Sequence, residues 1–269
     1  MDNLTALDVK LIVMGGGEPF LRPQFLERAC AEAIQRDIYP VVLTNGYMLS
    51  TRNQRAVDTL YNLYNIGVRN LSVSVDNIDD EYHSLDESHL LKSHTGLIAL
   101  EMAHMTGYTD LNVTTVLDPS HPERAQRVVT FLNGKYDIRI AGLQMAEPDD
   151  NSKFQSEKYF PQARNYHLVC DYLKEFADEY RIRNAPGYFD LLSHGITYKC
   201  TDPGYITIHP TGKAQLCQNI YGKACQTVDF TKPDMSKTYL EAWYQDMLDG
   251  YCPTCSINCN YDYHYGDKT

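Results

Sequence analysis

V-K-L-I-V-M-G-G-G-E-P, residues 9–19, joins an apolar run to three glycines, a carboxylate and a proline. Leu11–Met14 is short, apolar and partly β-branched, which predicts a buried parallel strand. The glycines allow a sharp turn and bring backbone N–H and C=O groups close to a ligand. Glu18 adds a negative charge at the carboxyl end of the strand, where α/β folds bind ligands. The stretch therefore predicts either a site for a cationic amino group or a glycine-rich turn with a solvated glutamate.

Two later apolar runs also end in polar signatures. Residues 41–43 lead into T-N-G at residues 44–46, and residues 71–75 lead into Asp76, which gives an S-x-D pattern with Ser74. Short apolar runs alternate with helical patterns, which predicts a parallel sheet with right-handed crossovers. We expect strands at residues 11–14, 39–43, 71–75, 111–117 and 138–143. We expect helices near residues 22–36, 52–65, 95–105, 122–132 and 163–180.

The order and spacing of G-G-E-P, T-N-G and S-x-D resemble the radical SAM superfamily. This resemblance implies an α/β fold that is a partial (β/α)6 radical SAM barrel lacking its first βα unit. It also implies that Glu18 and Gly17 hold the methionyl amino group of S-adenosylmethionine, while Ser74 and Asp76 lie near its ribose. Asn112 and Thr114 are weaker candidates, and no catalytic residue is assigned. The cofactor-binding residues implied are Gly16, Gly17, Glu18, Pro19, Asn45, Ser74 and Asp76.

The superfamily's C-x-x-x-C-x-x-C loop, whose thiolates hold a 4Fe–4S cluster, does not precede the G-G-E-P stretch. Only 14 residues stand before Gly15. We interpret the chain as N-terminally truncated. The alternatives are that a separate chain supplies the cluster loop, or that the chain is a natural non-catalytic relative. On this interpretation the chain alone is inactive and binds S-adenosylmethionine weakly or not at all.

Eight cysteines in a chain with no signal peptide predict metal binding rather than disulfides. Cys30 and Cys170 stand alone in helical patterns and are predicted to be buried thiols. The other six lie from Cys200 onward. One precedes a predicted hairpin at residues 204–216, two lie between this hairpin and a predicted helix at residues 239–248, and three follow that helix.

This tail resembles the auxiliary-cluster extension called SPASM or, in its shorter form, twitch. The resemblance implies one auxiliary 4Fe–4S cluster held by Cys200, Cys217, Cys252 and Cys255, with Cys259 as a substitute ligand. A structural zinc site uses the same C-x-x-C geometry and is the alternative. We therefore expect two domains, a partial radical SAM barrel at residues 1–185 and a SPASM/twitch-like domain at residues 186–269.

Composition restricts the partners. The net charge is −11 and no run of Lys or Arg occurs, which argues against nucleic acid. No apolar stretch has the length of a membrane span, so we expect a cytoplasmic protein without a membrane partner. His83, His89 and His94 fall in a polar stretch, residues 77–94, whose spacing matches no metal template and predicts a solvated loop.

The resemblance implies a function for the intact protein. It would cleave S-adenosylmethionine reductively and abstract hydrogen from a peptide or small-molecule substrate, with flavodoxin or ferredoxin as the reductant. The alternative is a non-catalytic iron–sulfur or zinc binding relative that acts as a recognition or electron-transfer partner.

Overall fold

The computed structural model describes most of the chain, namely residues 1–76, 78, 87–117, 123–135, 139–145, 163–184, 186–194, 206–215, 228–232 and 237–251. The chain divides into two compact units, which are described one at a time. We call Val9–Gln144 with Phe176–Arg183 the sheet unit. We call Asp2–Asp8, Met145–Glu175 and Asn184–Thr269 the terminal unit. The domain boundary expected at residues 185 and 186 stays a prediction.

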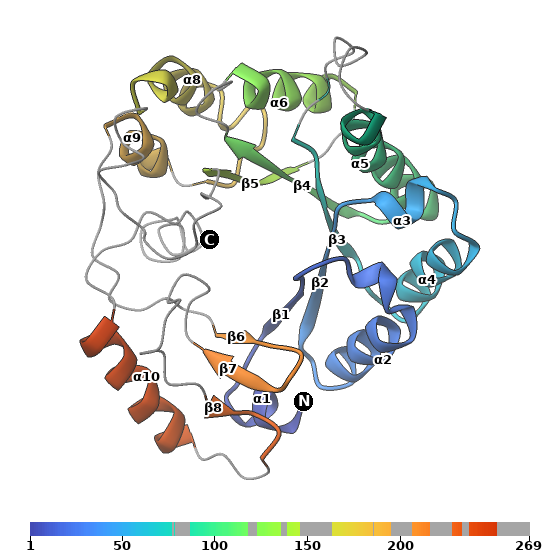
Figure 1. The fold of residues 1–269 in the computed structure, drawn as a ribbon, viewed down its shortest axis with the longest axis vertical. Helices are drawn as coiled ribbons and strands as arrows, with labels where there is room; N and C mark the ends of the chain where they lie inside the picture. The colour runs from blue at the N-terminus through green and yellow to red at the C-terminus, as the bar shows by residue number, and fades with distance from the viewer. Residues whose placement is uncertain are drawn as a thin grey trace. The chain divides into compact units, whose positions relative to one another are not determined.

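The sheet unit is built on five strands that neighbour one another in chain order (Figure 1). The first four are paired in parallel, which confirms the α/β class and the predicted strand order. The prediction that residues 11–14 form a buried strand was wrong, because Leu11 and Val13 are exposed on this outermost strand of the sheet. Predicted strand ends were off by one or two residues, as expected where hydrogen-bonded pairing sets the limits. The strands are β1 (Leu11–Met14), β2 (Tyr39–Thr44), β3 (Asn70–Ser74), β4 (Asp110–Leu117) and β5 (Arg139–Met145).

Strands β3 and β4 have two chemically different faces, because successive side chains point to opposite sides of a sheet. Leu71, Val73 and Val113 are fully buried on one face. The other face carries polar side chains, for example Ser72 opposite Asn112. A parallel sheet covered on both faces is normally apolar on both. The polar face is therefore the unusual feature of this sheet.

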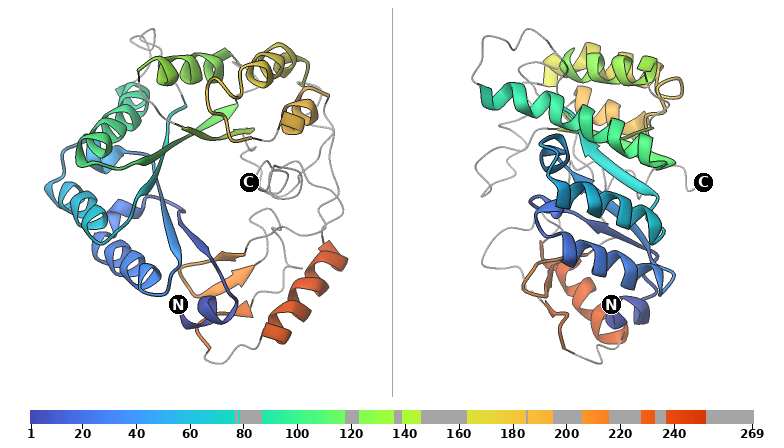
Figure 2. Two further views of the ribbon diagram at one scale, coloured as in Figure 1. Left: turned by 180° about the vertical axis from the view of Figure 1, so that it is seen from behind. Right: turned by 90° about the vertical axis from the view of Figure 1, so that its right-hand side faces the viewer.

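Helices of the sheet unit cover the apolar face. Helix α2 packs against β2, α5 against β3 and α6 against β4. Figure 2 shows these helices and strands from two further directions. The helical segments are η1 (Pro19–Leu21), α2 (Pro23–Ile34), α3 (Tyr47–Ser50), α4 (Gln54–Asn65), α5 (Glu87–Thr106) and α6 (Glu123–Lys135).

Helix α4 shows how local sequence sets an element's limits. Asn53 Oδ1 accepts hydrogen bonds from the backbone N–H groups of Arg55 (3.1 Å) and Ala56 (3.3 Å), which caps the helix start. Gly67 follows the helix end with a φ of 110°, which is typical of a glycine that ends a helix. Because Asn53 caps α4, the helix predicted to begin near Arg52 begins at Gln54, after the separate short helix α3.

Two other predictions of helix limits were wrong. Residues 87–94, expected in a solvated loop with His89 and His94, belong to α5. The segment contains no Gly or Pro, so its polar composition does not stop a helix. The helix predicted at residues 163–180 ends at Glu175 as α8, because residues 176–181 form turns. His83 lies outside the described residues.

The terminal unit contains a small antiparallel sheet in the order β6-β7-β8, which confirms the predicted hairpin. Strand β8 and helix α9 were not predicted. The elements of this unit are α1 (Asp2–Ala6), α8 (Ala163–Glu175), α9 (Pro186–His194), β6 (Thr207–Ile208), β7 (Lys213–Gln215), β8 (Val228–Asp229) and α10 (Lys237–Tyr251).

The N-terminal helix α1 belongs to this C-terminal core. Trp243 and Leu240 of α10 pack with hairpin residues in a small apolar cluster, and Leu7 packs against it. The Asn3 side-chain amide donates hydrogen bonds of 2.9 Å to the backbone carbonyls of Phe230 and Lys232. These contacts, which order the start of the chain, join residues more than 200 positions apart in the sequence.

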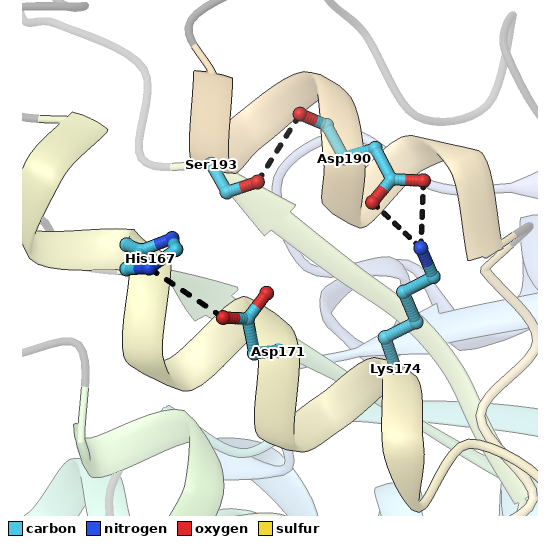
Figure 3. Close-up of polar contacts among 5 residues, drawn as sticks. All are labelled: His167, Asp171, Lys174, Asp190 and Ser193. Atoms are coloured by element: carbon cyan, nitrogen blue, oxygen red, sulfur yellow. Dashed lines mark hydrogen bonds and ion pairs between the residues drawn. The ribbon is translucent and has the colours of Figure 1, made fainter.

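Helices α8 and α9 are joined at the surface by charged side chains (Figure 3). Lys174 Nζ lies 2.7 and 2.8 Å from the two carboxylate oxygens of Asp190. His167 Nε2 and Asp171 Oδ2 are 3.6 Å apart within α8. All four side chains are exposed, so solvent screens these ion pairs. The two helices are therefore held together mainly by the buried residues between them.

In the part of the chain that the structure describes, no helix is long and apolar enough to cross a membrane.

Candidate functional site

The Glu18 carboxylate joins the loops that follow β1 and β2. Glu18 Oε1 accepts hydrogen bonds from Thr44 Oγ1 (2.9 Å) and from the N–H of Phe20 (3.1 Å). Glu18 Oε2 accepts a hydrogen bond of 2.9 Å from the N–H of Asn45. A carboxylate offers about four acceptor positions, so one remains for a further donor. The side chain is half-buried, with its charge at the carboxyl rim of the sheet.

Gly16 and Gly17 form an exposed turn beside this carboxylate. Their φ angles are 83° and 64°, a region that other residues adopt only with strain. A Cβ built at either position would meet nothing within 4 Å. The turn therefore exposes backbone N–H and C=O groups to open space, next to a negative charge.

The T-N-G stretch after β2 is held in one conformation. Thr44 Oγ1 accepts a 3.0 Å hydrogen bond from Gly46 N–H, while Asn45 Oδ1 accepts one of 2.9 Å from Tyr47 N–H. Gly46 has a φ of 76°, and a Cβ there would lie 2.5 Å from the Thr95 carbonyl oxygen. Glycine is therefore the residue that fits at position 46, where the loop lies against the backbone of α5.

The end of β3 contributes hydroxyl groups. Ser74 Oγ lies 3.4 Å from Thr114 Oγ1 of β4, and the next residues along β3 lead to the exposed Asp76. Because β1, β2 and β3 are parallel, their carboxyl ends share one rim. Of the predicted residues, Glu18 and Asn45 are joined by a hydrogen bond, and Gly16, Gly17 and Pro19 adjoin Glu18 in the sequence. Ser74 and Asp76 lie at the end of β3, the strand next to β2.

Thr44 belongs to the T-N-G motif but was not predicted to be a site residue. Thr44 is 3% exposed, and its hydroxyl donates to Glu18 while accepting from Gly46. Thr95 of α5 also contacts this loop, because its hydroxyl donates to the Asn45 carbonyl oxygen at 3.3 Å. A polar residue that ends a buried strand was the available signal for Thr44. Nothing in the local sequence marks Thr95.

The rim can bind a cation and orient a polar ligand. It offers the carboxylates of Glu18 and Asp76, exposed backbone groups, and the hydroxyls of Ser74 and Thr114. These groups together suit an ammonium group and a sugar. The cysteines predicted as ligands, Cys200, Cys217, Cys252, Cys255 and Cys259, lie outside the described residues. Among the residues that are described, no group of three or more His, Cys, Asp or Glu side chains has a metal-binding arrangement.

Cys30 and Cys170 are confirmed as buried thiols. Burial raises the pKa of each thiol to about 12, so both stay protonated at neutral pH. A metal ligand must be the thiolate, and a buried neutral thiol in an apolar helix face does not supply it.

Part of the chain resembles known proteins. Residues 1–125 match the model of the Radical SAM superfamily. GTP 3',8-cyclase of Tolumonas auensis is 34% identical over 155 residues, which cover 55% of this chain and 43% of that protein.

Two further relatives match most of the chain at lower identity. GTP 3',8-cyclase of Staphylococcus carnosus is 22% identical over 260 residues, covering 90% of this chain and 72% of that protein. GTP 3',8-cyclase of Actinobacillus pleuropneumoniae serotype 3 is 25% identical over 256 residues, covering 91% and 72%. None of the three carries a name that refers to a SPASM or twitch extension.

Proposed function

We propose that this chain, whose residues 1–125 form a radical SAM superfamily domain, binds S-adenosylmethionine at the carboxyl rim of β1, β2 and β3. The observation that carries the proposal is the Glu18 carboxylate, fixed by Thr44 and Asn45 beside the exposed glycine turn. The methionyl amino group would occupy the remaining acceptor position of Glu18 and contact backbone carbonyls of Gly16 and Gly17.

The residues of the rim fit this cofactor. An ammonium group binds where a carboxylate and carbonyl acceptors lie close together. Glu18 supplies the carboxylate and the glycine turn supplies the carbonyl groups, with no side chain over the turn. Ser74 and Asp76 would bind the ribose hydroxyls from β3. When bound beside a reduced 4Fe–4S cluster, S-adenosylmethionine supplies the 5′-deoxyadenosyl radical that the superfamily uses. The residues of this chain contribute orientation and exclusion of water.

The described residues do not fit a 4Fe–4S cluster, because their two cysteines are buried neutral thiols. We therefore assign the ligands of the superfamily's cluster to none of them. For the tail we propose that Cys200, Cys217, Cys252 and Cys255 hold one metal centre, with Cys259 as the substitute. The C-x-x-C spacing supports an auxiliary 4Fe–4S cluster or a zinc ion, and a brown colour after anaerobic purification would favour iron.

For the substrate we propose a small molecule rather than a peptide, with GTP as the first candidate. The support is that relatives aligned over about nine-tenths of this chain are named GTP 3',8-cyclase. A reductant such as flavodoxin or ferredoxin would supply the electron that the reaction needs.

A Glu18→Gln variant tests the cofactor site. We expect S-adenosylmethionine, measured by isothermal titration or ligand-observed NMR, to bind this variant about tenfold more weakly than wild type. The reason is that a charge-assisted contact contributes roughly 1.5–3 kcal/mol. Thermal unfolding of each protein shows whether the rim has stayed folded.

The matched control is Glu27→Gln. Glu27 also joins two elements, since Glu27 Oε1 accepts hydrogen bonds from Thr59 (2.8 Å) and Asn62 (3.2 Å) between α2 and α4. It stands away from the rim, so its loss should change stability but not affinity. Equal affinity of all three proteins would place the amino group elsewhere, and the proposal would fail.

A further inference from the structure

The polar face of the sheet unit carries three cross-strand pairs in a row. Their register places Asn70 opposite Asp110, Ser72 opposite Asn112, and Ser74 opposite Thr114. We call these six residues the polar ladder. Its upper rung, Ser74 and Thr114, lies at the rim proposed for S-adenosylmethionine. The ladder therefore extends from that rim toward the amino ends of the strands.

The lower rung is satisfied by hydrogen bonds within the ladder. Asn70 Nδ2 donates to Asp110 Oδ2 at 2.6 Å, and Asn112 Nδ2 donates to Asn70 Oδ1 at 3.0 Å. Asn112 Nδ2 also donates to the Asp110 carbonyl oxygen at 3.2 Å. Because acceptors surround this nitrogen, the orientation of the Asn112 amide is settled and its Oδ1 points away from the lower rung.

The middle rung is not satisfied. Ser72 Oγ and Asn112 Oδ1 are both buried, and neither has a hydrogen-bond partner among the residues that the structure describes. Ser72 is 3% exposed and Asn112 is 1% exposed. Buried polar atoms in native proteins nearly always have a partner, so two on one rung need a physical explanation.

The two atoms are complementary rather than alike. Ser72 supplies a hydroxyl that can donate, and Asn112 Oδ1 can only accept. A ligand edge that carries an acceptor beside a donor would satisfy both. On the opposite face of β3, Leu71 and Val73 show that this strand accommodates apolar side chains, so polarity at residue 72 is not imposed by the strand.

We propose that Ser72 and Asn112 are a specificity-determining pair that binds an amide-like substrate edge, with an acceptor next to an N–H donor. The proposal rests on the proposed function, because it places the substrate beside the cofactor rim. In this arrangement the Ser72 hydroxyl donates to the ligand's carbonyl oxygen. Asn112 Oδ1 accepts from the neighbouring ligand N–H.

GTP and a methylated analogue test the pair. GTP and ITP present an acceptor oxygen beside an N–H donor, whereas 1-methyl-GTP keeps the oxygen and carries a methyl group in place of the donor. We expect wild type to bind GTP and ITP about tenfold more tightly than 1-methyl-GTP, measured by isothermal titration. An Asn112→Leu variant should lose this preference, because the acceptor that pairs with the N–H group is gone.

The Ser72→Ala variant separates recognition from structure. It removes one buried unsatisfied hydroxyl, so its melting temperature should equal or exceed that of wild type. We expect its GTP affinity to fall about fivefold, which corresponds to one neutral hydrogen bond. Thr115→Val is the matched control, because Thr115 Oγ1 donates to the Val75 carbonyl oxygen at 2.9 Å on the helix-covered face. That control should melt earlier and bind GTP as wild type does.

The outcomes distinguish this inference from the cofactor proposal. Unchanged GTP affinity in Ser72→Ala, or no preference for GTP over 1-methyl-GTP in wild type, would overturn the pair even if S-adenosylmethionine binds. A preference for GTP that Asn112→Leu removes, together with a lower GTP affinity of Ser72→Ala, would support the pair even if Glu18→Gln has no effect on S-adenosylmethionine.

Discussion

Glu18 joins two loops with one side chain, and the proposed function would give that side chain a second role. Its three hydrogen bonds to Thr44, Asn45 and Phe20 connect two loops of the rim before any ligand arrives. The same contacts hold the carboxylate in place, so a bound cation would not have to immobilise it. Preorganisation of this kind lowers the entropy cost of binding. The sequence predicted a charge beside a turn, but a solvated glutamate and a positioned one look alike until the partners from β2 are seen.

The two buried thiols predict a pH dependence of stability. In the unfolded chain both thiols ionise near their ordinary pKa of 9.0, while in the folded protein Cys30 and Cys170 keep their protons until about pH 12. Because burial raises the pKa of each thiol in the folded state, raising the pH favours the unfolded chain, whose thiols ionise first. The folded protein therefore keeps its full stability below pH 9 and loses part of it between pH 9 and 12. Each thiol should cost roughly 1 kcal/mol of unfolding free energy by pH 10.

Urea unfolding at pH 7.5 and at pH 10 measures this effect. A double variant, Cys30→Ala with Cys170→Ala, should show a smaller loss of stability over the same interval, although each substitution lowers the starting value. Iodoacetamide should leave both thiols unmodified in the native protein at pH 8 and label them in urea. Labelling of either in the native state would show that it is accessible, against the burial seen here.

Capping at the start of α4 is an effect at the level of an element. Asn53→Ala removes the side-chain acceptor for two N–H groups at the helix start, so it should lower the unfolding free energy by about 1 kcal/mol. The urea midpoint of the purified protein measures it. Gln54→Ala, at the next and exposed position, is the control, since its only described contact is a surface hydrogen bond to Asp58. Equal midpoints for the two variants would mean that the cap contributes nothing.

Elements set by local sequence were predicted well. The strands of the sheet unit, their order and the hairpin at β6 and β7 follow from apolar runs, turn residues and the crossover rule. Elements that depend on distant partners were not predicted. Helix α1 is ordered by carbonyls of residues 230 and 232, and β8 by its pairing with β7. The unsatisfied rung at Ser72 and Asn112 also depends on a register between two strands, which the sequence does not state.

At the scale of the whole molecule, the order of units along the chain differs from a simple tandem. From Asp2 the chain lies in the terminal unit, then passes through Val9–Gln144 of the sheet unit, and afterwards returns to the terminal unit except at Phe176–Arg183, which belongs to the sheet unit. The radical SAM match at residues 1–125 therefore starts in one unit and continues in the other. Truncating α1 should weaken the small core around Trp243, far along the chain, because Leu7 packs against it.

This return of the chain decides how the molecule would respond to mechanical tension. If handles at Asp2 and Tyr251 were pulled apart in an optical trap, the force would act first on the Asn3 and Leu7 contacts that hold α1 to the hairpin. The five-stranded sheet, enclosed in sequence between the two attachment points, would feel tension only after those contacts rupture. We expect a short first extension followed by a longer one as the sheet opens. With Leu7→Ala the first rupture should need less force while the second stays the same, and a single rupture releasing the full length would contradict this order.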